Sequence, residues 1–449
     1  MIWSASSNSN NRNNAWNFNG DNGNMNNDNR NNTNSVRCVA PSRDNPCPIF
    51  KVQEMYSFEE VYQAYKLCRL RKRPSPDQIR FELKLAENLS HLQMELNSGS
   101  YKVSPYKCFI VTEPKPREIF AANFRDGVVH HVIVSRLQPI WEKKFYYGSF
   151  ACRKGKGSHA ALKYLIGKHK SVSCGGKKEV FFLQMDLAAF FVTINRNILF
   201  ELLLPTVDDL NFKQLVGAVI LNDPTTDVIV KSSESERLLV PPHKSLFHRK
   251  YHGQGIPIGN LTSQFGANVY LNSLDHFVSR KLRVGAYQRY MDDLLLIDTD
   301  KEKLLSSIEP IKDWMAKYRS QEFNSSKTIL GSFRNERMNY LGYCVFEKEG
   351  ELVVLPQEKK KWKLVSKARE LKKSSAAPQE GTHPLRPVKF AAFQNNELAR
   401  VRSSLGYFFH AKSFAFRKKV INKLQEDLDA KSEFFGVRAP RIKFYKPQT

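Results

Sequence analysis

The chain has 449 residues, enough for two or three domains with their own hydrophobic cores, and its net charge is +26. A surface this basic repels itself unless it meets a polyanion, so nucleic acid is the expected class of partner. No uninterrupted apolar run reaches membrane-spanning length and no signal-peptide pattern occurs, so no membrane partner is expected. Seven cysteines are scattered without CxxC pairs, which argues against a disulfide framework or zinc ribbon and favours a reducing compartment.

Residues 1–50 differ in composition from the rest of the chain. They hold 15 asparagines between Asn8 and Asn34. Such low-complexity sequence cannot bury enough apolar surface to fold alone, so we predict a disordered Asn-rich leader. Globular patterning begins near Tyr56, and Met55 is a candidate for the start of the folded protein or of translation.

Helix and strand patterns alternate from residue 57 onward. The first part is predicted to hold an amphipathic helix, a hairpin with a Pro-Lys-Pro turn and a second amphipathic helix, at 57–73, 106–124 and 126–141. The middle part is predicted to hold a strand that leads into a turn and helix at 179–191, an inserted loop at 230–244, and a Gly/Pro loop that becomes a helix at 256–278. Two further hairpins are predicted at 287–298 and 338–355, and a mainly helical tail from about 356. This order predicts an α+β domain followed by a helical one.

The positive charge is concentrated towards the C-terminal end. Residues 351–449 hold 22 Lys plus Arg against 9 Asp plus Glu, so half of the net charge lies in under a quarter of the chain. Phe, Tyr and Trp alternate with the basic residues there, which favours a nucleic-acid-binding surface over a general solubility charge.

Two adjacent carboxylates, Asp292 and Asp293, stand in the apolar stretch YQRYMDDLLLID. Burying two such charges side by side is costly unless cations lie against them. A third carboxylate, Asp186, ends the predicted strand VFFLQMD, so the three acids meet at one sheet edge if the two strands are neighbours. Such a cluster suits two Mg²⁺ ions about 4 Å apart, the arrangement used for in-line phosphoryl transfer. An Asp-Asp pair alone also occurs in solvated turns, and we expect Asp298 and Asp300 to be surface residues.

The order of these motifs resembles that of reverse transcriptases over roughly residues 55–425. YMDD at 290–293 resembles the most characteristic motif of that family, and MDLAAFFVTIN at 185–195 resembles the motif that carries its first metal-binding aspartate. The resemblance implies a right-hand polymerase fold of class α+β, with fingers, a palm built on an antiparallel sheet, and a helical thumb. After the Asn-rich leader at 1–50, it implies N-terminal helices and fingers at 51–180, a palm at 181–355 with a fingers/palm loop at 226–262, and a basic thumb and tail at 356–449.

The resemblance also implies which residues form the metal site. Asp186, Asp292 and Asp293 are the expected catalytic carboxylates that bind two Mg²⁺ ions, and Leu187 is expected beside them in the metal site. Lys327 in NSSKT matches a catalytic lysine positioned to protonate the pyrophosphate.

Further matches surround the incoming nucleotide and the template. Arg117 in PKPREI matches the fingers arginine that grips the triphosphate, a role that suits a forked, permanently charged guanidinium, and Lys115 is its expected companion. Phe191 matches the aromatic steric gate that collides with a ribose 2′-hydroxyl and so favours deoxynucleotides. Arg125 in FRDGVVHH matches a basic residue near the template, although Gly127 departs from the family pattern.

Two more segments are expected to contact the template or primer. NYLGY, with Tyr340 and Gly342, resembles the hairpin that grips the primer. ACRKGKG lacks the GxxxxGK[ST] pattern of a phosphate-binding P-loop, and Lys154 and Lys156 are expected to contact the template or primer backbone. A solvated basic loop remains the alternative for this second segment.

The segment IPIGNLTSQ at 256–264 indicates which group of reverse transcriptases the chain resembles. Ile258 stands before Gly259 where many family members have Gln, and Gln264 stands in place of a proline; all three are expected nucleotide-binding residues. This pattern resembles the reverse transcriptases of diversity-generating retroelements, in which the aliphatic residue is linked to inaccurate copying at template adenines. A Gln side chain hydrogen-bonds the incoming nucleotide whereas Ile offers only shape, so we expect weaker discrimination. Some phage-defence reverse transcriptases share a similar loop.

The Asn-rich leader is consistent with the same family. It resembles the C-terminal end of a variable lectin-like protein read from an unmutated template repeat. Both codons for Asn begin with two adenines, so a repeat built for adenine mutagenesis translates as Asn-rich sequence. On this interpretation residues 1–41 are translated template-repeat DNA; an unrelated disordered leader is the alternative.

We therefore expect an RNA-directed DNA polymerase that makes cDNA from a template-repeat RNA with adenine-biased errors, for mutagenic retrohoming. Its expected partners are the template RNA, the cDNA/RNA duplex, dNTPs and, by family resemblance, a small basic accessory protein. Its expected location is the cytoplasm of a bacterium, with a bacterial or phage gene. A phage-defence reverse transcriptase and a non-catalytic RNA-binding protein with a polymerase fold are the alternatives; the presence of all three acids and Lys327 argues against the second.

Overall fold

The computed structural model describes residues 55–358 except 71–73 and 114, two short strands at 14–18 and 25–29, and residues 366 and 422. The chain divides into two compact units, Met1–Glu54 and Met55–Thr449. In the first unit, β1 (Asn14–Phe18) pairs antiparallel with β2 (Met25–Asn29). These strands lie inside the Asn-rich segment, whose predicted disorder stays a prediction. The predicted thumb at 356–449 lies almost entirely outside the described residues.

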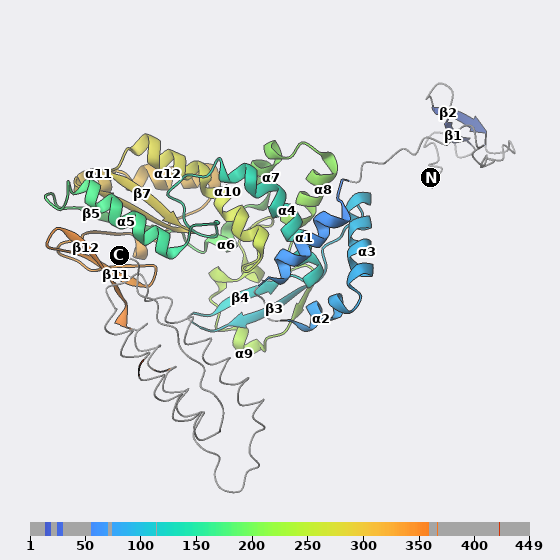
Figure 1. Cartoon of the computed structure of the whole chain (residues 1–449), viewed down its shortest axis with the longest axis horizontal. Helices are drawn as coiled ribbons and strands as arrows, with labels where there is room; N and C mark the ends of the chain where they lie inside the picture. The colour runs from blue at the N-terminus through green and yellow to red at the C-terminus, as the bar shows by residue number, and fades with distance from the viewer. Residues whose placement is uncertain are drawn as a thin grey trace, which may run out of the picture. The chain divides into compact units, whose positions relative to one another are not determined.

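The second unit begins with three helices, and a fourth follows a β-hairpin (Figure 1): α1 (Phe58–Arg69), α2 (Pro76–Leu83), α3 (Leu85–Ser98) and α4 (Phe124–Glu142). Helices α1 and α4 were predicted from periodicity. Helix α1 begins where the Ser57 hydroxyl accepts a hydrogen bond from the N–H of Glu60, and α3 ends at Gly99, whose φ of +70° favours glycine. Helix α4 buries the predicted apolar face, each member at most 1% exposed: Val128, Val129, Val132, Ile133 and Leu137. This burial anchors α4 in the main core.

The hairpin between α3 and α4 is part of a three-stranded sheet, in the order β4-β3-β6. The predicted hairpin is confirmed as β3 (Tyr106–Val111) antiparallel to β4 (Arg117–Ala121). Strand β6 (Val228–Val230), next to the predicted inserted loop, pairs parallel with β3. The buried Glu118 carboxylate of β4 also accepts hydrogen bonds from the Ser245 hydroxyl at 2.6 Å and the Leu246 N–H at 2.8 Å. The insertion is therefore attached to the sheet on both sides.

A four-stranded antiparallel sheet lies at the centre of the remaining part. Its order β7-β8-β5-β9 joins these strands: β7 (Ala286–Tyr290), β8 (Asp293–Asp298), β5 (Phe181–Asp186) and β9 (Ile329–Ser332). The β7–β8 hairpin is the one predicted at 287–298. The pairing of β8 with β5 brings together segments far apart in the sequence, and it decides where the acidic residues meet.

Both faces of this sheet are covered, which explains the unbroken apolar run in β8. Leu294 and Leu296 point into a core shared with residues of α10 (Leu261–Phe277) and α12 (Ile308–Arg319). Leu295 and Ile297 point the other way and pack in a cluster that includes residues of α5 (Ser158–Val172). Helix α5 lies against β7 and β8, and Figure 1 shows it beside β7. The sheet is therefore an interior layer.

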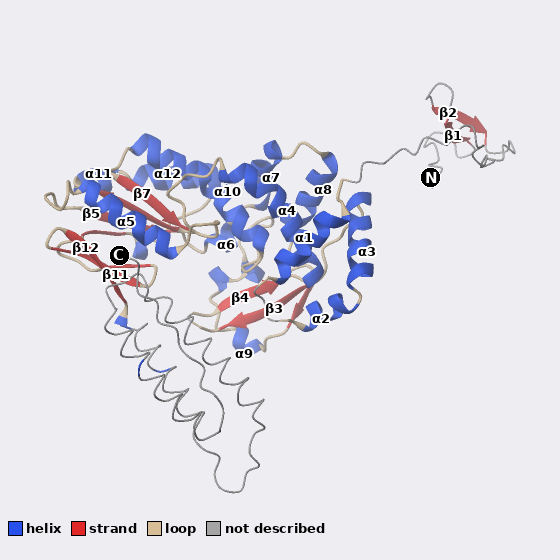
Figure 2. Cartoon of the chain, viewed as in Figure 1, coloured by secondary structure: helices blue, strands red, loops and turns tan. Residues whose placement is uncertain are grey.

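The remaining elements complete a mixed α+β fold (Figure 2). The predicted hairpin at 338–355 is part of a three-stranded antiparallel sheet, β10 (Met338–Tyr340), β11 (Tyr343–Lys348) and β12 (Glu351–Pro356). The other α-helices are α6 (Phe190–Thr193), α7 (Arg196–Leu203), α8 (Leu210–Ile220), α9 (Glu234–Arg237) and α11 (Lys301–Ser306). Short 3₁₀ or π turns are η1 (Leu204–Thr206), η2 (Pro242–Lys244), η3 (Leu246–His248), η4 (Val278–Leu282) and η5 (Ser325–Lys327). Among the described helices, none has the length and apolar character needed to cross a membrane.

One surface prediction is wrong. Asp300 is exposed and caps α11, but Asp298 at the end of β8 is only 7% exposed. The Asp298 carboxylate accepts hydrogen bonds from the N–H groups of Gly285 and Asp300 and forms an ion pair with Lys303. Burial opposes ionisation, but these partners together lower the pKa of Asp298. The sequence did not reveal these partners, since two of them are backbone groups.

Candidate active site

The structure brings the three predicted acids to one edge of the four-stranded sheet. Asp186, the last residue of β5, is the direct cross-strand partner of Asp293, the first residue of β8. Asp292 occupies the turn that precedes β8. The N–H of the buried Leu187 donates to the carbonyl of Asp292 at 3.2 Å, so the backbone beyond β5 is tied to the same turn.

The turn itself is tight. Tyr290 pairs with Asp293, so only Met291 and Asp292 connect β7 to β8. Met291 has a φ of +58°, in the left-handed region that a side chain disfavours. Such a conformation persists only where surrounding contacts hold it, and it turns Asp292 towards the end of β5.

Lys327 lies at the same edge. The N–H of Asn324 donates to the carbonyl of Asp186 at 2.8 Å, which places the 324–328 segment beside β5. The Lys327 ammonium forms an ion pair with the Asp186 carboxylate. A cation therefore stands next to the acidic cluster, as expected for a group that acts near it.

The carboxylates of this cluster repel one another. Burial, together with the negative charges of Asp186 and Asp292, raises the pKa of Asp293 to about 7, although the Gln184 amide donates to both Asp293 oxygens at 3.1 and 3.0 Å. Burial and the charge of Asp186 also raise the pKa of Asp292, while Lys327 and Arg117 oppose that rise. The edge therefore carries more negative charge than the nearby protein cations neutralise.

A divalent cation fits this donor set. Carboxylate oxygens are the hard ligands that Mg²⁺ prefers, and one or two carboxylates completed by waters and substrate phosphates are enough to hold it. Within residues 55–358, however, no three His, Cys, Asp or Glu side chains form a ready-made metal cage. The three carboxylates thus suit divalent ions that they hold jointly with a substrate, and the main chain of Leu187 lies beside them. The number of ions stays a prediction.

The residues expected around the triphosphate come from two segments, the β3–β4 hairpin and α6. Arg117 begins β4 and is exposed. Its positive charge acts on Asp292 and opposes the rise in the pKa of that carboxyl group. Lys115 is exposed in the preceding turn. Phe191 lies in α6, half-buried, its carbonyl accepting a hydrogen bond from the N–H of Ile256 at 2.9 Å. The structure therefore joins Phe191 to the start of the Gly/Pro loop.

That loop contains Ile258 and Gly259, which line a pocket of about 450 Å³ together with β3, β4, α2 and α4. Gly259 has a φ of +106°, and a β-carbon there would meet Ile119 of β4 at 3.7 Å. Gln264 lies in the first turn of α10, where its N–H donates to the carbonyl of Asn260. The loop thus packs against the β3–β4 hairpin.

Of the residues expected to contact template or primer, Arg125 is engaged within the protein. Its guanidinium pairs with Glu95 and Asp126 and lies 4.9 Å from the centre of the Tyr101 ring. These contacts give Arg125 a structural role, and its template contact stays a prediction.

The other expected template or primer residues differ in exposure. Lys154 is exposed, whereas Lys156 donates to the Tyr147 carbonyl at 3.0 Å and stands over that ring. Burial lowers the pKa of Lys156. Tyr340 is 1% exposed and accepts a hydrogen bond from the Gln288 amide, and Gly342 follows with a φ of +84°. Tyr340 therefore supports the hairpin from inside.

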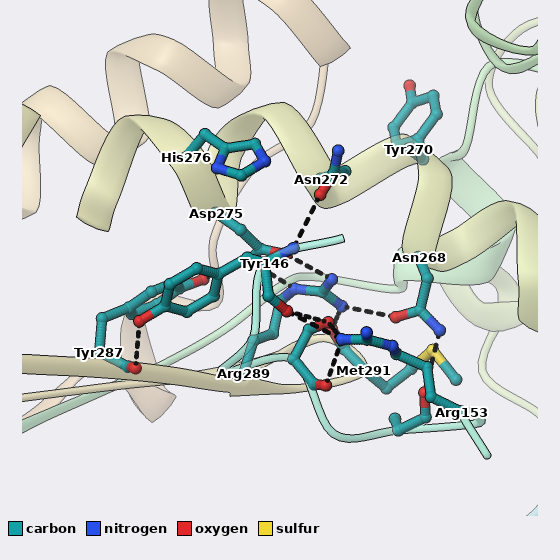
Figure 3. Close-up of polar contacts among 12 residues, drawn as sticks. Tyr146, Arg153, Asn268, Tyr270, Asn272, Asp275, His276, Tyr287, Arg289 and Met291 are labelled. Carbon is teal, nitrogen blue, oxygen red and sulfur yellow. Dashed lines mark hydrogen bonds and ion pairs between the residues drawn. The ribbon is translucent and has the colours of Figure 1, made fainter. Parts of the chain in front are cut away.

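Sequence reasoning missed a buried polar cluster behind the turn (Figure 3). Arg289 and Asp275 form an ion pair with both side chains fully buried, and Tyr287 and Asn268 bond to it. Gln184, which bonds to Asp293, was also missed. One signal was present: a charged Arg289 within a strand that otherwise reads as buried requires a buried partner.

Adjacent acids at the edge of an antiparallel sheet, with a lysine and an arginine beside them, are typical of metal-dependent phosphoryl-transfer enzymes. Comparison with known families shows which family of such enzymes the chain matches. Residues 113–345, about half of the chain, match the model of the family described as reverse transcriptase (RNA-dependent DNA polymerase). The chain belongs to this family, and it carries an RNA-directed DNA polymerase domain.

Individual relatives are distant. Protein YkfC of Escherichia coli (strain K12) is 23% identical over 318 residues, which cover 62% of this chain and 78% of YkfC. The uncharacterized 91 kDa protein in the cob intron of Schizosaccharomyces pombe is 23% identical over 185 residues, 41% of this chain and 20% of that protein. The chain therefore spans about a fifth of the latter. Among solved structures, apo telomerase from Candida tropicalis truncated from its C-terminal domain aligns with a TM-score of 0.42 at 11% identity, over 56% of this chain and 55% of that one.

Proposed function

We propose that this reverse transcriptase copies a template-repeat RNA into cDNA with errors concentrated at adenines, for mutagenic retrohoming in a diversity-generating retroelement. The observation that carries the proposal is the place of Ile258. It lines the pocket between the Gly/Pro loop and the β3–β4 hairpin, beside Gly259 and close to the hairpin that bears Arg117. An aliphatic side chain there can contact a nucleotide only through its shape and cannot hydrogen-bond to it. The enzyme therefore discriminates less well between bases.

The chemistry we assign to the acidic edge is nucleotidyl transfer. Asp186, Asp292 and Asp293 hold two Mg²⁺ ions, which when bound activate a primer 3′-hydroxyl and neutralise charge on the leaving pyrophosphate. Lys327, paired with Asp186, is placed to deliver a proton to the pyrophosphate. Arg117 grips the triphosphate, because its forked donors match phosphate oxygens.

The same proposal assigns the parts of a right hand. The β4-β3-β6 sheet and the N-terminal helices are the fingers, the β7-β8-β5-β9 sheet is the palm, and residues 356–449 are the basic thumb. Phe191 at the edge of the palm is the steric gate, and Lys154 and Lys156 guide the template or primer backbone. A structured template RNA and a small basic accessory protein are the partners of this assembly, and residues 1–41 are translated template-repeat sequence.

A primer-extension assay tests the proposal. The purified full chain is given a defined RNA template, an annealed DNA primer, four dNTPs and Mg²⁺, and the cDNA is sequenced. We expect magnesium-dependent cDNA with errors concentrated opposite adenine. The Asp292→Asn variant should make no cDNA while still binding the RNA, because only metal binding is lost.

Matched substitutions in the loop separate base selection from polymerisation. Ile258→Gln should make copying at adenine more accurate, while Ile258→Leu, which adds no amide, should keep the error pattern. Errors spread evenly over all four template bases would remove the mutagenic function and leave the polymerase. An Asp292→Asn variant that polymerises normally would remove the metal assignment itself.

A further inference from the structure

Arg289 is held inside the protein by a fork of hydrogen bonds (Figure 3). It lies in β7, three residues before Asp292, and its side chain is 0% exposed. Its Nε donates to Asp275 Oδ1 at 2.8 Å and its Nη2 donates to Asp275 Oδ2 at 2.7 Å. Asp275, on α10, is equally buried and also accepts a hydrogen bond from the Tyr287 hydroxyl at 2.7 Å. The helix therefore fixes the guanidinium in one orientation.

The third nitrogen of this guanidinium points at the turn formed by Met291 and Asp292, here called the catalytic turn. Arg289 Nη1 donates to the carbonyl of Met291 at 2.8 Å and to Asn268 Oδ1 at 3.3 Å. Met291 is the residue with a φ of +58°, immediately before Asp292. The carbonyl of Met291 belongs to the peptide that joins Met291 to Asp292, so fixing it fixes the direction in which Asp292 leaves the turn.

The backbone of Arg289 is also paired on its other side. Its N–H donates to the carbonyl of Gly148, and its carbonyl accepts from the N–H of Phe150, both at 2.9 Å. Asn268 extends the link, since its amide donates to the carbonyl of Ala151 at 2.9 Å. The same cluster therefore joins the turn to the start of the basic ACRKGKG segment.

Stability alone does not account for this pair. Two apolar side chains of similar volume in place of a buried ion pair often leave a fold equally or more stable. An apolar pair, however, cannot bond to a main-chain carbonyl. The hydrogen bond from Arg289 to the Met291 carbonyl of the turn is therefore what an apolar pair would lose.

We propose that Arg289, oriented by Asp275, is a positioning residue for the catalytic turn: it holds the Met291 carbonyl so that the Asp292 carboxylate points at the metal site. This inference rests on the proposed role of Asp292 in binding Mg²⁺. Groups that orient a metal ligand without touching the metal typically contribute about 10- to 100-fold in metal affinity or activity.

The first test variant is Arg289→Lys. Lysine keeps a positive charge beside Asp275, but a single ammonium nitrogen cannot reproduce the fork that reaches both Asp275 and the Met291 carbonyl. We expect the Mg²⁺ concentration for half-maximal cDNA synthesis to rise about 10-fold or more. Binding of Mn²⁺ to the complex of protein, template–primer and dNTP, measured by electron paramagnetic resonance, should weaken by a similar factor, and this second readout does not depend on turnover.

A matched control is Arg136→Lys. Arg136 makes the same kind of contacts at a distance from the site, with two hydrogen bonds to Glu60 at 2.6 and 2.7 Å and one to the Met55 carbonyl at 2.6 Å. It should leave Mn²⁺ affinity and Mg²⁺ dependence within about twofold, since its fork does not reach the turn.

A double variant, Asp275→Leu with Arg289→Met, keeps the test decisive if the lysine variant does not fold. We expect it to retain cooperative unfolding and to show the same weakening of Mn²⁺ binding. Wild-type Mn²⁺ affinity in a folded Arg289 variant, with Asp292→Asn inactive and deficient in Mn²⁺ binding, overturns the positioning role and leaves the proposed function intact. Wild-type polymerisation by Asp292→Asn overturns the proposed metal role, whatever the Arg289 variants do.

Discussion

Asp293 is predicted to weaken the fold at neutral pH, and its removal should stabilise the protein. Its pKa rises from 3.8 to about 7 in the folded chain because the carboxylate is buried and faces Asp186 and Asp292. The folded state therefore holds this proton more tightly than the unfolded state, so stability falls as pH rises between these two values and stays low above pH 7. At 1.36 kcal/mol per tenfold change in affinity, the cost is about 4 kcal/mol at most.

The perturbation is Asp293→Asn, which keeps a hydrogen-bond acceptor for Gln184 and removes the charge. Urea unfolding without divalent ions should show the variant more stable than the wild type at pH 8, by up to about 4 kcal/mol, with the difference vanishing near pH 4. Added Mg²⁺ should stabilise the wild type more than the variant. The matched control is Asp298→Asn: the pKa of Asp298 is lowered by its partners, so this variant should lose stability at pH 8. Equal or lower stability of Asp293→Asn at pH 8 would refute the reasoning.

Three further predictions concern the site and the core. Phe191→Ala should admit ribonucleotides, lowering the dNTP/rNTP ratio of kcat/KM about tenfold or more, whereas a wild-type ratio would remove the steric gate. Lys327→Ala should lower the rate of incorporation about 100-fold with template affinity unchanged in a binding assay, because the proposed proton donor to the pyrophosphate is lost. Leu296→Ala, at a fully buried position, should cost about 3 kcal/mol in urea unfolding, while Ile329→Ala at a site 46% exposed should cost under about 0.5 kcal/mol. Equal costs would contradict the burial of Leu296 in the core.

Much of the fold followed from patterning along the sequence. The apolar stripe of α4 and the hairpin β3–β4 were predictable because helical and strand periodicity express which face is buried. The meeting of Asp186 with Asp293 was predictable only as a conditional statement, since it depends on β5 and β8 being neighbours. Register between distant strands is decided by packing on both faces of the sheet, which no local pattern contains.

The parts that could not be predicted share a cause: their partners are distant in sequence or belong to the backbone. Strand β6 has three residues, too few for a period to show, and it is defined by its pairing with β3. Asp298 looked like a surface acid because the N–H of Gly285 that it accepts from carries no signal in the sequence. Arg289 was visible as an oddity in a buried strand, but its partner Asp275 lies on a helix that the pattern alone does not bring near.

The attachment of the insertion to the β4-β3-β6 sheet has a mechanical consequence. Glu118, next to Arg117, is hydrogen-bonded to Ser245 and Leu246, which lie a short stretch before Ile258 in the chain. If Arg117 and Ile258 have the roles proposed for them, a movement of β4 that brings Arg117 to a nucleotide also shifts the chain that leads to Ile258. Under the proposed function, triphosphate binding and base selection are then coupled, so changes in the length of the insertion should alter fidelity and nucleotide affinity together.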